Sequence, residues 1–192
     1  RELWRSDGTD EGTYMVKDIM PGSETGYYHS LVVMNGILYF NASNGFDGTE
    51  LFRSDGTAEG TYQVYDIYEG PLGSNPEMLT STGSLLFFRA TDEAHGNELW
   101  RTDGSAEGTF LVKDINEGNI GYTNIQSLEA AGDLIYFSCY APAYGYELWK
   151  SDGSPEGTEI VKDISPGSTS TQQLSEFTFF NNKLYFLAKT SG

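Results

Sequence analysis

The chain has little cysteine, no long apolar run and few basic residues, and each of these shortages excludes a kind of bond or a class of partner. It has a single cysteine, Cys139, so no disulfide forms within the chain, and we expect this small side chain to be buried rather than reactive. No apolar run approaches the ~20 residues of a transmembrane helix, so we expect no direct membrane insertion. Lys and Arg number 11 against 28 Asp and Glu, giving a net charge of −17. This charge argues against nucleic acids and anionic membranes as partners, because both need a basic patch.

Helical patterning is also lacking. No stretch carries apolar periodicity over three helical turns, and 23 glycines interrupt the chain. The apolar runs are instead about five to seven residues long, rich in Val, Ile, Leu, Tyr and Phe, and bounded by Gly, Asn and Asp. These patterns predict an all-β fold.

What the chain does have is a repeat. Glu-Leu-Trp-x-x-Asp-Gly begins at Glu2, Glu98 and Glu147, and a version with Phe in place of Trp begins at Glu50, so the spacings are 48, 48 and 49 residues. Each copy continues through a polar turn to Val-x-Asp-Ile, and then to two apolar runs that flank a tight turn such as Asn35-Gly36. Four strand signals in about 48 residues predict a β-propeller built from four-stranded antiparallel blades.

The repeat divides one domain, residues 1–192, into four blade-equivalents. We expect the third and fourth strands of a blade in 1–20, whole blades in about 21–67, 68–115 and 116–164, and the first and second strands of a blade in 165–192. The two halves either join into a closed four-bladed ring, or the segment belongs to a larger propeller. Because the chain has no starting Met and no signal peptide, we favour a piece cut from a longer chain.

Charge and size suggest a strand register. If Ser6 pairs with Thr13 across the polar turn, the Glu of each motif faces a Lys on the next strand. The expected pairs are Glu2–Lys17, Glu98–Lys113 and Glu147–Lys162. The large apolar residues at the third motif position should pack between blades; they are Trp4, Phe52, Trp100 and Trp149.

The motif also resembles a known family. Residues 2–9 (Glu-Leu-Trp-Arg-Ser-Asp-Gly-Thr) and the three echoes are similar to the bacterial ELWxxDGT repeat, over the whole chain. The resemblance implies propeller blades of large secreted or cell-surface proteins, often exported across the outer membrane with a C-terminal sorting domain. Because those proteins are secreted or lie on the cell surface, we expect an extracellular or cell-surface location. The resemblance implies neither a catalytic activity nor a defined ligand.

An enzyme is not expected. Nucleophilic catalysis needs a nucleophile, a base and an orienting group held together. His29 and His95 lie 66 residues apart in loops that are not equivalent, and Asp92-Glu93 before His95 is more simply a solvated loop. The repeated carboxylates occupy structural positions.

The acidic turns raise the question of a metal. Two carboxylates recur in each turn: Asp7 and Glu11, Asp55 and Glu59, Asp103 and Glu107, and Asp152 and Glu156. Oxygen ligands at alternating positions suit Ca²⁺, but an Asp that bonds its own backbone explains the same pattern. We favour turn chemistry and no cofactor, with calcium as the alternative. The Asp of Val-x-Asp-Ile (positions 18, 66, 114 and 163) is expected to accept a hydrogen bond between blades.

The loops that differ between copies are the candidate binding surface. Exposed aromatics there could stack on a sugar or hold a protein partner; the alternative is that they cover blade edges. The candidates are Phe46, His95, Tyr122, Tyr144 and Tyr146. Two functions follow: a non-catalytic scaffold, adhesion or protein-binding platform, or a lectin-like propeller with one glycan site per blade. The second should repeat its contact residues, which these loops do not, so the first is favoured.

Overall fold

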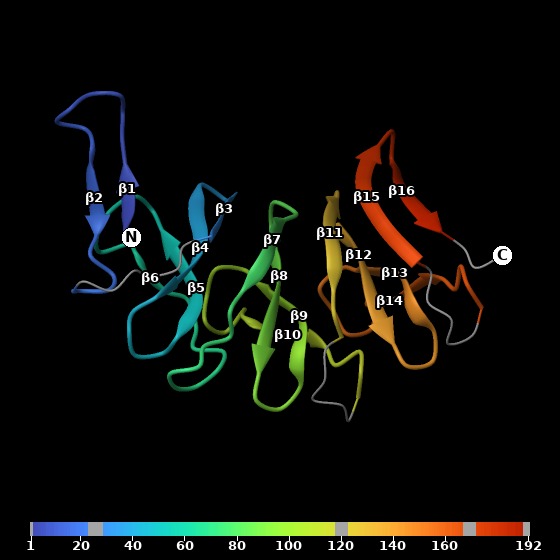
Figure 1. Ribbon diagram of the computed structural model, residues 1–192. Coiled ribbons are helices and arrows are strands. Elements are labelled where there is room, and N and C mark those ends of the chain that lie inside the picture. Colours follow the sequence, from blue (N-terminus) through green and yellow to red (C-terminus); the bar gives the residue numbers. More distant parts are fainter. Residues whose placement is uncertain (1, 23–28, 118–122, 167–171, 190–192) are drawn as a thin grey trace.

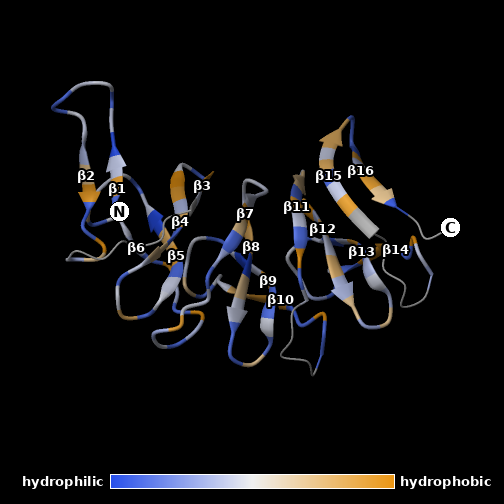
Figure 2. Cartoon of the chain, viewed as in Figure 1, coloured by the Kyte–Doolittle hydropathy of each residue, from blue (hydrophilic) through white to orange (hydrophobic). Residues whose placement is uncertain are grey.

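The computed structural model describes the chain except residues 1, 23–28, 118–122, 167–171 and 190–192. Its described part is all-β and contains no helix, which confirms the all-β part of the predicted fold class. Hydrophobic residues recur along the strands of every sheet (Figure 2).

The strands of the described residues form five antiparallel sheets, each a meander in chain order. A two-stranded sheet begins the chain, with β1 (Leu3–Arg5) and β2 (Tyr14–Lys17). The next sheet contains β3 (His29–Met34), β4 (Ile37–Ser43), β5 (Thr49–Ser54) and β6 (Tyr62–Gln63). The third contains β7 (Glu77–Ser81), β8 (Leu86–Asp92), β9 (Gly96–Thr102) and β10 (Phe110–Lys113). The fourth contains β11 (Gln126–Ala131), β12 (Leu134–Ala141), β13 (Gly145–Ser151) and β14 (Glu159–Lys162). The last two strands are β15 (Gln172–Phe180) and β16 (Lys183–Lys189).

The five sheets stand side by side along an open arc, with β1–β2 at one end and β15–β16 at the other (Figure 1). The described residues do not close into a ring, so the closed four-bladed alternative does not describe this structure. The motif copies that begin at Glu50, Glu98 and Glu147 lie on the third strands β5, β9 and β13, and the first copy lies on β1 of the two-stranded sheet; each Val-x-Asp-Ile comes at or just after the next strand.

The apolar core lies between sheets rather than within one. Trp100 of β9 packs with Leu51 of the preceding sheet, and Trp149 of β13 packs with Leu99 of the sheet before it. Phe52 likewise belongs to a cluster that includes Leu3 of β1. These three aromatics are buried, as the sequence predicted. The prediction is wrong for the fourth aromatic at this position, Trp4, which is 60% exposed because the described residues place no sheet in front of it.

Backbone geometry explains the hairpin turns. Asn35 and Gly36 have φ values of 52° and 75°, the two positive angles that the Asn-Gly signal predicted. A second set of positive φ angles was not predicted: it recurs in the first strand of every sheet except β1–β2, at Ser30, Met78, Ser127 and Glu176. These residues lie where the pairing with the second strand slips, so they form a repeated β-bulge.

Candidate functional site

The aspartate of each polar turn bonds within its own turn. Asp7 Oδ1 accepts hydrogen bonds from the Thr9 amide at 2.9 Å and the Thr9 hydroxyl at 2.7 Å. Asp103 holds Ser105 in the same way, at 2.9 and 2.7 Å. The hydroxyl bond is the main cause that lowers the pKa of Asp7 and Asp103, followed by the amide bond.

The turn also closes tightly over this carboxylate. A Cβ added to Gly12 would lie 2.0 Å from Asp7 Oδ1, and one added to Gly108 would lie 2.0 Å from Asp103 Oδ1. Any larger residue at this position would have to displace the aspartate carboxylate from its hydrogen bonds. The glutamates of the four turns are exposed; they are Glu11, Glu59, Glu107 and Glu156. In the described ranges, no group of three or more His, Cys, Asp or Glu side chains is placed to hold a metal ion.

The register prediction is right at the turn and wrong further along the strands. Ser6 Oγ and Thr13 Oγ1 are 2.6 Å apart, as expected. A bulge then shifts the pairing by one residue, so that Lys113 lies opposite Leu99 and Lys162 opposite Leu148. Lys17 is similarly opposite Leu3. The expected pairs Glu2–Lys17, Glu98–Lys113 and Glu147–Lys162 are therefore wrong.

The motif glutamates bind backbone and hydroxyl groups instead. Glu50 is fully buried, and its carboxylate accepts hydrogen bonds from the Ser74 amide at 2.7 Å and the Ser74 hydroxyl at 2.5 Å. Ser74 leads into β7, so this contact joins two sheets. Glu98 meets the hydroxyl of Thr123 at the equivalent place, and Glu147 accepts from the Ile164 amide at 2.9 Å.

Burial changes the acidity of these groups. Burial raises the pKa of Glu50 and of Glu98 to about 7. The hydrogen bonds from Ser74 and Thr123 favour the charged form and lower the pKa, but their effect is smaller than that of burial. The sequence held one signal for this role: a carboxylate that recurs beside Leu and Trp in a strand covered on both faces must find buried donors.

The motif cations reach the following sheet as well. They donate to backbone carbonyl oxygens of its polar turn, which ties each sheet to the next. The contacts are Arg5 Nη1 to Gly56 O at 3.4 Å, Lys17 Nζ to Thr61 O at 2.5 Å, Arg53 Nη1 to Gly104 O at 3.5 Å and Lys113 Nζ to Thr158 O at 2.9 Å.

One carboxylate oxygen of the aspartate in Val-x-Asp-Ile does not accept the hydrogen bond between sheets that the sequence predicted. Oδ1 of Asp66, Asp114 and Asp163 is buried without a hydrogen-bond partner, so this atom is not the acceptor between sheets that the sequence suggested. Burial raises the pKa of Asp66, and the nearby charges of Asp47 and Glu69 add to the effect.

Two of the variable loops share a local design. In the β4–β5 loop, Asn44 Oδ1 accepts from the Phe46 amide at 2.8 Å, and Phe46 itself is 79% exposed. In the β8–β9 loop, Asp92 accepts from the His95 amide at 2.6 Å and pairs with His95 Nδ1 at 2.7 Å. This pairing raises the pKa of His95, whose side chain is 39% exposed. Asp92 and His95 thus order their own loop.

The third variable loop, between β12 and β13, exposes one tyrosine and packs the other. Tyr144 is 39% exposed. Tyr146 lies against the Tyr140 ring at 5.5 Å, and its hydroxyl bonds Asn124, so part of its surface is used inside the molecule. Tyr122 lies outside the described residues.

The two kinds of loop lie on opposite rims. In an antiparallel meander, the turn after the first strand and the turn after the third share one side, and the loop after the second strand lies on the other. The polar turns therefore share one rim of the arc, and the variable loops share the other. Substitutions in the variable loops do not touch the repeated turns.

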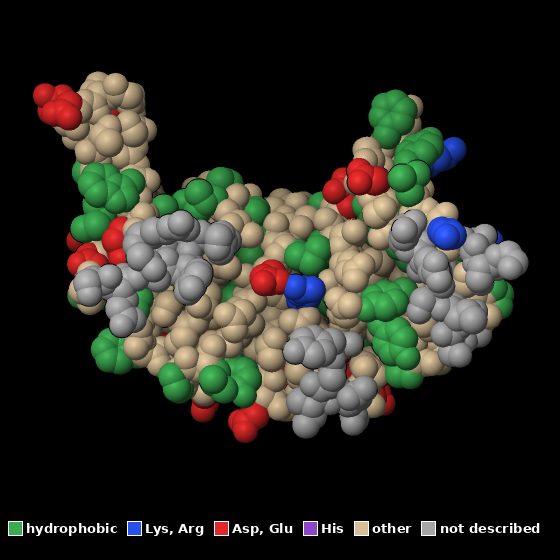
Figure 3. Space-filling view, in the orientation of Figure 1, with side chains coloured by type: hydrophobic (Ala, Val, Ile, Leu, Met, Phe, Trp, Pro, Cys, Tyr) green, Lys and Arg blue, Asp and Glu red, His purple; other side chains and the backbone are tan. Residues whose placement is uncertain are grey.

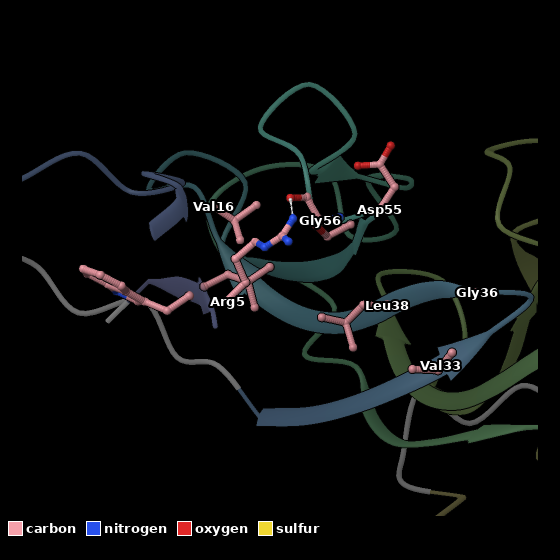
Figure 4. A pocket seen from close by; sticks show the side chains of 10 residues that line it. Arg5, Val16, Val33, Gly36, Leu38, Asp55 and Gly56 are labelled. Atoms are coloured by element: carbon pink, nitrogen blue, oxygen red, sulfur yellow. Dashed lines mark hydrogen bonds between the residues drawn. The ribbon is translucent and has the colours of Figure 1, made fainter. Parts of the chain in front are cut away.

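Two pockets lie beside the half-sheets at the ends of the arc. One of about 210 Å³ lies between β1–β2 and the sheet of β3–β6, and Val16, Val33 and Leu38 line it with Arg5, whose guanidinium reaches Gly56 (Figure 4). The other, of about 480 Å³, lies between β13–β14 and β16. The sequence did not predict either one. Within the described residues, no helix is long and apolar enough to cross a membrane.

Comparisons with known proteins give the fold and nothing finer. No family and no curated protein matches the chain. The computationally designed Ika4 protein is similar in structure, with 12% identity, 92% of each chain covered and a TM-score of 0.49. A mutant of puromycin hydrolase complexed with PGG is similar over 96% of this chain and 28% of that one, with 16% identity and a TM-score of 0.54. This chain is therefore similar in fold to about a quarter of the puromycin hydrolase chain.

Proposed function

We propose that this chain is a β-propeller segment of a secreted or cell-surface bacterial protein, in which each four-stranded sheet is a blade. It acts without catalysis, as a scaffold that presents its variable loops to a protein partner, including in adhesion. The proposal contains no cofactor and no nucleic acid.

One observation carries the proposal: most of the repeated motif side chains bond or pack within the fold, whereas the unrepeated loops expose the aromatic side chains of Phe46 and Tyr144. The turn aspartates, the motif glutamates and the motif cations all bond within a turn or between neighbouring sheets. Phe46 and Tyr144 are instead exposed, in the β4–β5 and β12–β13 loops. Exposed aromatics are the residues from which binding hot spots are most often built.

A binding experiment with two loop variants tests this function. Immobilised chain captures proteins from bacterial culture medium, and the same captured protein is then measured against Phe46→Ala and Tyr144→Ala. We expect each substitution to weaken binding by about tenfold or more, because a lost aromatic anchor commonly costs at least that.

The matched control is Glu11→Ala, which changes an exposed residue on the opposite rim and should leave the affinity unchanged. A partner that binds both loop variants as well as the original chain contradicts the proposal. A glycan-array signal that both loop substitutions remove, without any protein captured, favours the lectin-like alternative instead.

A further inference from the structure

Two large apolar side chains are more exposed than any other of the described residues: Phe46 at 79% and Leu72 at 69%. Phe46 lies in the β4–β5 loop, and Leu72 lies in the segment that joins β6 to β7. In the meander, this segment leaves the fourth strand on the same rim as the variable loops. Both residues therefore lie at the junction of two complete four-stranded sheets, β3–β6 and β7–β10.

Backbone contact holds the two segments against each other. A Cβ added to Gly48 would lie 2.4 Å from the Gly73 nitrogen, and one added to Gly73 would lie 2.2 Å from the Thr49 nitrogen. The Asn75 amide also donates to the Thr49 carbonyl oxygen at 2.9 Å. Phe46 and Leu72 are two residues and one residue away from these contacts, so they belong to one small surface region, which we call the apolar patch.

The loop that carries Phe46 is fixed by its own side chains. Asn44 Oδ1 accepts hydrogen bonds from the Phe46 amide at 2.8 Å and the Asp47 amide at 3.0 Å. Asn44 Nδ2 donates to Asp47 Oδ2 at 2.7 Å and to Gln63 Oε1 at 3.2 Å. Because the loop is already ordered, a partner that docks on it loses little free energy to ordering.

The fold does not require an aromatic residue at this position. The equivalent residues of the next two sheets, one repeat and two repeats later, are Ala94 and Ala143. Both alanines lie in loops of the same place between the second and third strands. The ring of Phe46 is therefore exposed at one sheet only, without a part in the repeated packing.

The surroundings of the apolar patch are acidic. Burial raises the pKa of Asp66, and the nearby charges of Asp47 and Glu69 raise it further. None of these three carboxylates forms an ion pair with a described residue. Residues 44–50 and 62–76 contain no Lys or Arg. A positive charge at the patch would therefore meet carboxylates that no cation of these segments neutralises.

Figure 3 shows hydrophobic and acidic side chains together along the lower edge of the molecule, beneath β5 (Figure 1). An apolar centre with acidic groups beside it is complementary to a partner that has the opposite charge around its own apolar side chain.

We propose that the apolar patch docks a basic segment of another protein, with one large apolar side chain against Phe46 and Leu72. Flanking Lys or Arg side chains of that segment pair with Asp47 and Glu69. The apolar contact supplies most of the affinity, and the charges select the partner and speed its approach. This inference rests on the proposed function, because it specifies which chemistry the variable loops recognise.

The test is an NMR titration of the isotopically labelled 192-residue chain with three short peptides. They are Lys-Lys-Trp-Leu-Lys-Lys, Lys-Lys-Ser-Ser-Lys-Lys and Glu-Glu-Trp-Leu-Glu-Glu, so each of the last two lacks one property of the first. We expect the first to bind about tenfold more tightly than either of the others. The largest changes of amide shift should fall in residues 44–48 and 69–73.

Three substitutions identify the contact, and a fourth is the control. Phe46→Ala and Leu72→Ala should each bring the affinity of the first peptide close to that of the Ser-Ser peptide. Glu69→Gln should weaken both basic peptides and reduce the effect of added salt on their binding. Glu11→Gln removes the same charge from an exposed residue on the opposite rim and should change neither affinity. The amide spectrum of each variant checks that it is folded.

Four results overturn the proposal. They are equal affinity for the three peptides, shift changes outside both segments, binding that survives Phe46→Ala and Leu72→Ala, and equal effects of Glu69→Gln and Glu11→Gln. The protein captured for the proposed function separates the two claims. If it binds Phe46→Ala and Tyr144→Ala more weakly but Leu72→Ala and Glu69→Gln normally, the proposed function stands and this inference fails. If it binds all four variants normally, the proposed function fails.

Discussion

At the scale of single residues, the motif glutamate is the least expected part of the chain. A carboxylate in a strand covered on both faces costs desolvation, and Glu50 offsets that cost with Ser74 of the next sheet. The sequence showed that the residue recurs, and we assigned it to a lysine on the adjacent strand. The assignment failed because the bulge at the fourth strand leaves no mark in the sequence: the residues there look like any other in the strand.

Substituting Glu98 by Gln tests the buried carboxyl. Its folded pKa of about 7 lies above the ordinary 4.5, so the folded state binds the proton more tightly than the unfolded state. The stability from this group is fully present below about pH 4.5 and is lost as pH rises through 7, by at most roughly 3 kcal/mol at 1.36 kcal/mol per pKa unit. We expect the free energy of unfolding, measured with urea at pH 5 and pH 8, to fall less in Glu98→Gln than in the original chain.

The control for this titration is Glu11→Gln, which alters an exposed carboxylate and should keep the original pH dependence. An equal fall in Glu98→Gln and the original chain would show that Glu98 is not the group that titrates.

One cross-strand pair shows two motif positions changing together. Arg5, Arg53 and Arg101 each lie over the ring of the residue opposite, at 5.3, 5.2 and 4.2 Å from the centroid. In the last copy the aromatic is replaced by Glu159, and the residue opposite is Lys150, whose Nζ lies 3.1 Å from the carboxylate. A cation–π contact is thus replaced by an ion pair, and at an exposed site both make a similarly small contribution to stability.

At the scale of elements, the polar turn is the most completely specified unit. Asp, Gly and Thr or Ser have fixed roles in it, and each role is a local contact within seven residues. Such turns could be predicted from sequence because their chemistry is local, as for the Asn35-Gly36 hairpin. The first-strand bulge could not, because Met78 and Glu176 are not residues that favour positive φ.

The turn should fold without calcium. Asp55 Oδ1 already accepts two hydrogen bonds from Thr57, and a Cβ at Gly60 would lie 2.1 Å from this oxygen, so the carboxylate faces its own turn. We expect excess EDTA to leave the melting temperature unchanged within error, in a thermal scan followed by circular dichroism.

A fall of more than about 5 °C, which is roughly 1–2 kcal/mol for a domain of this size, would instead show that a cation stabilises the chain. Adding back Ca²⁺ or Mg²⁺ separately would then identify which ion restores the melting temperature. Mg²⁺ serves as the control for a general effect of divalent charge.

At the scale of the whole molecule, position along the arc decides what a motif residue contributes. Trp100 and Trp4 have the same place in the repeat, yet one is 6% exposed and the other 60%. The 48-residue period predicted the strands and the apolar faces, because both depend on residues close in sequence. It could not predict the exposure of Trp4, which depends on a neighbouring sheet.

Replacing each of these tryptophans by Ala measures the effect of position. We expect Trp100→Ala to lower the free energy of unfolding by about 3–5 kcal/mol, because it leaves a cavity between two sheets. Trp4→Ala in dilute solution should stay within about 0.5 kcal/mol of the original chain, as an exposed substitution does. Urea denaturation measures both, at a concentration where sedimentation shows a monomer.

Equal decreases in the free energy of unfolding for Trp100→Ala and Trp4→Ala would contradict the conclusion that only Trp100 is packed between sheets. A large loss for Trp4→Ala alone would show that the first half-sheet is covered in the dilute chain. A small loss for Trp100→Ala would mean that the cluster around Leu51 and Phe88 does not hold the sheets together.

The contacts between sheets have a consequence for how such a chain can evolve. Among the described residues each sheet meets only the sheets beside it, and equivalent motif residues recur at these junctions: Glu50 and Glu98, the motif cations, and the aromatics Phe52, Trp100 and Trp149. Duplication or loss of one whole 48-residue unit therefore recreates every junction unchanged. An insertion of any other length within the strands separates these residues from their partners. Growth in complete units is thus built into the spacing of the motif, whereas the variable loops are free to change length one residue at a time.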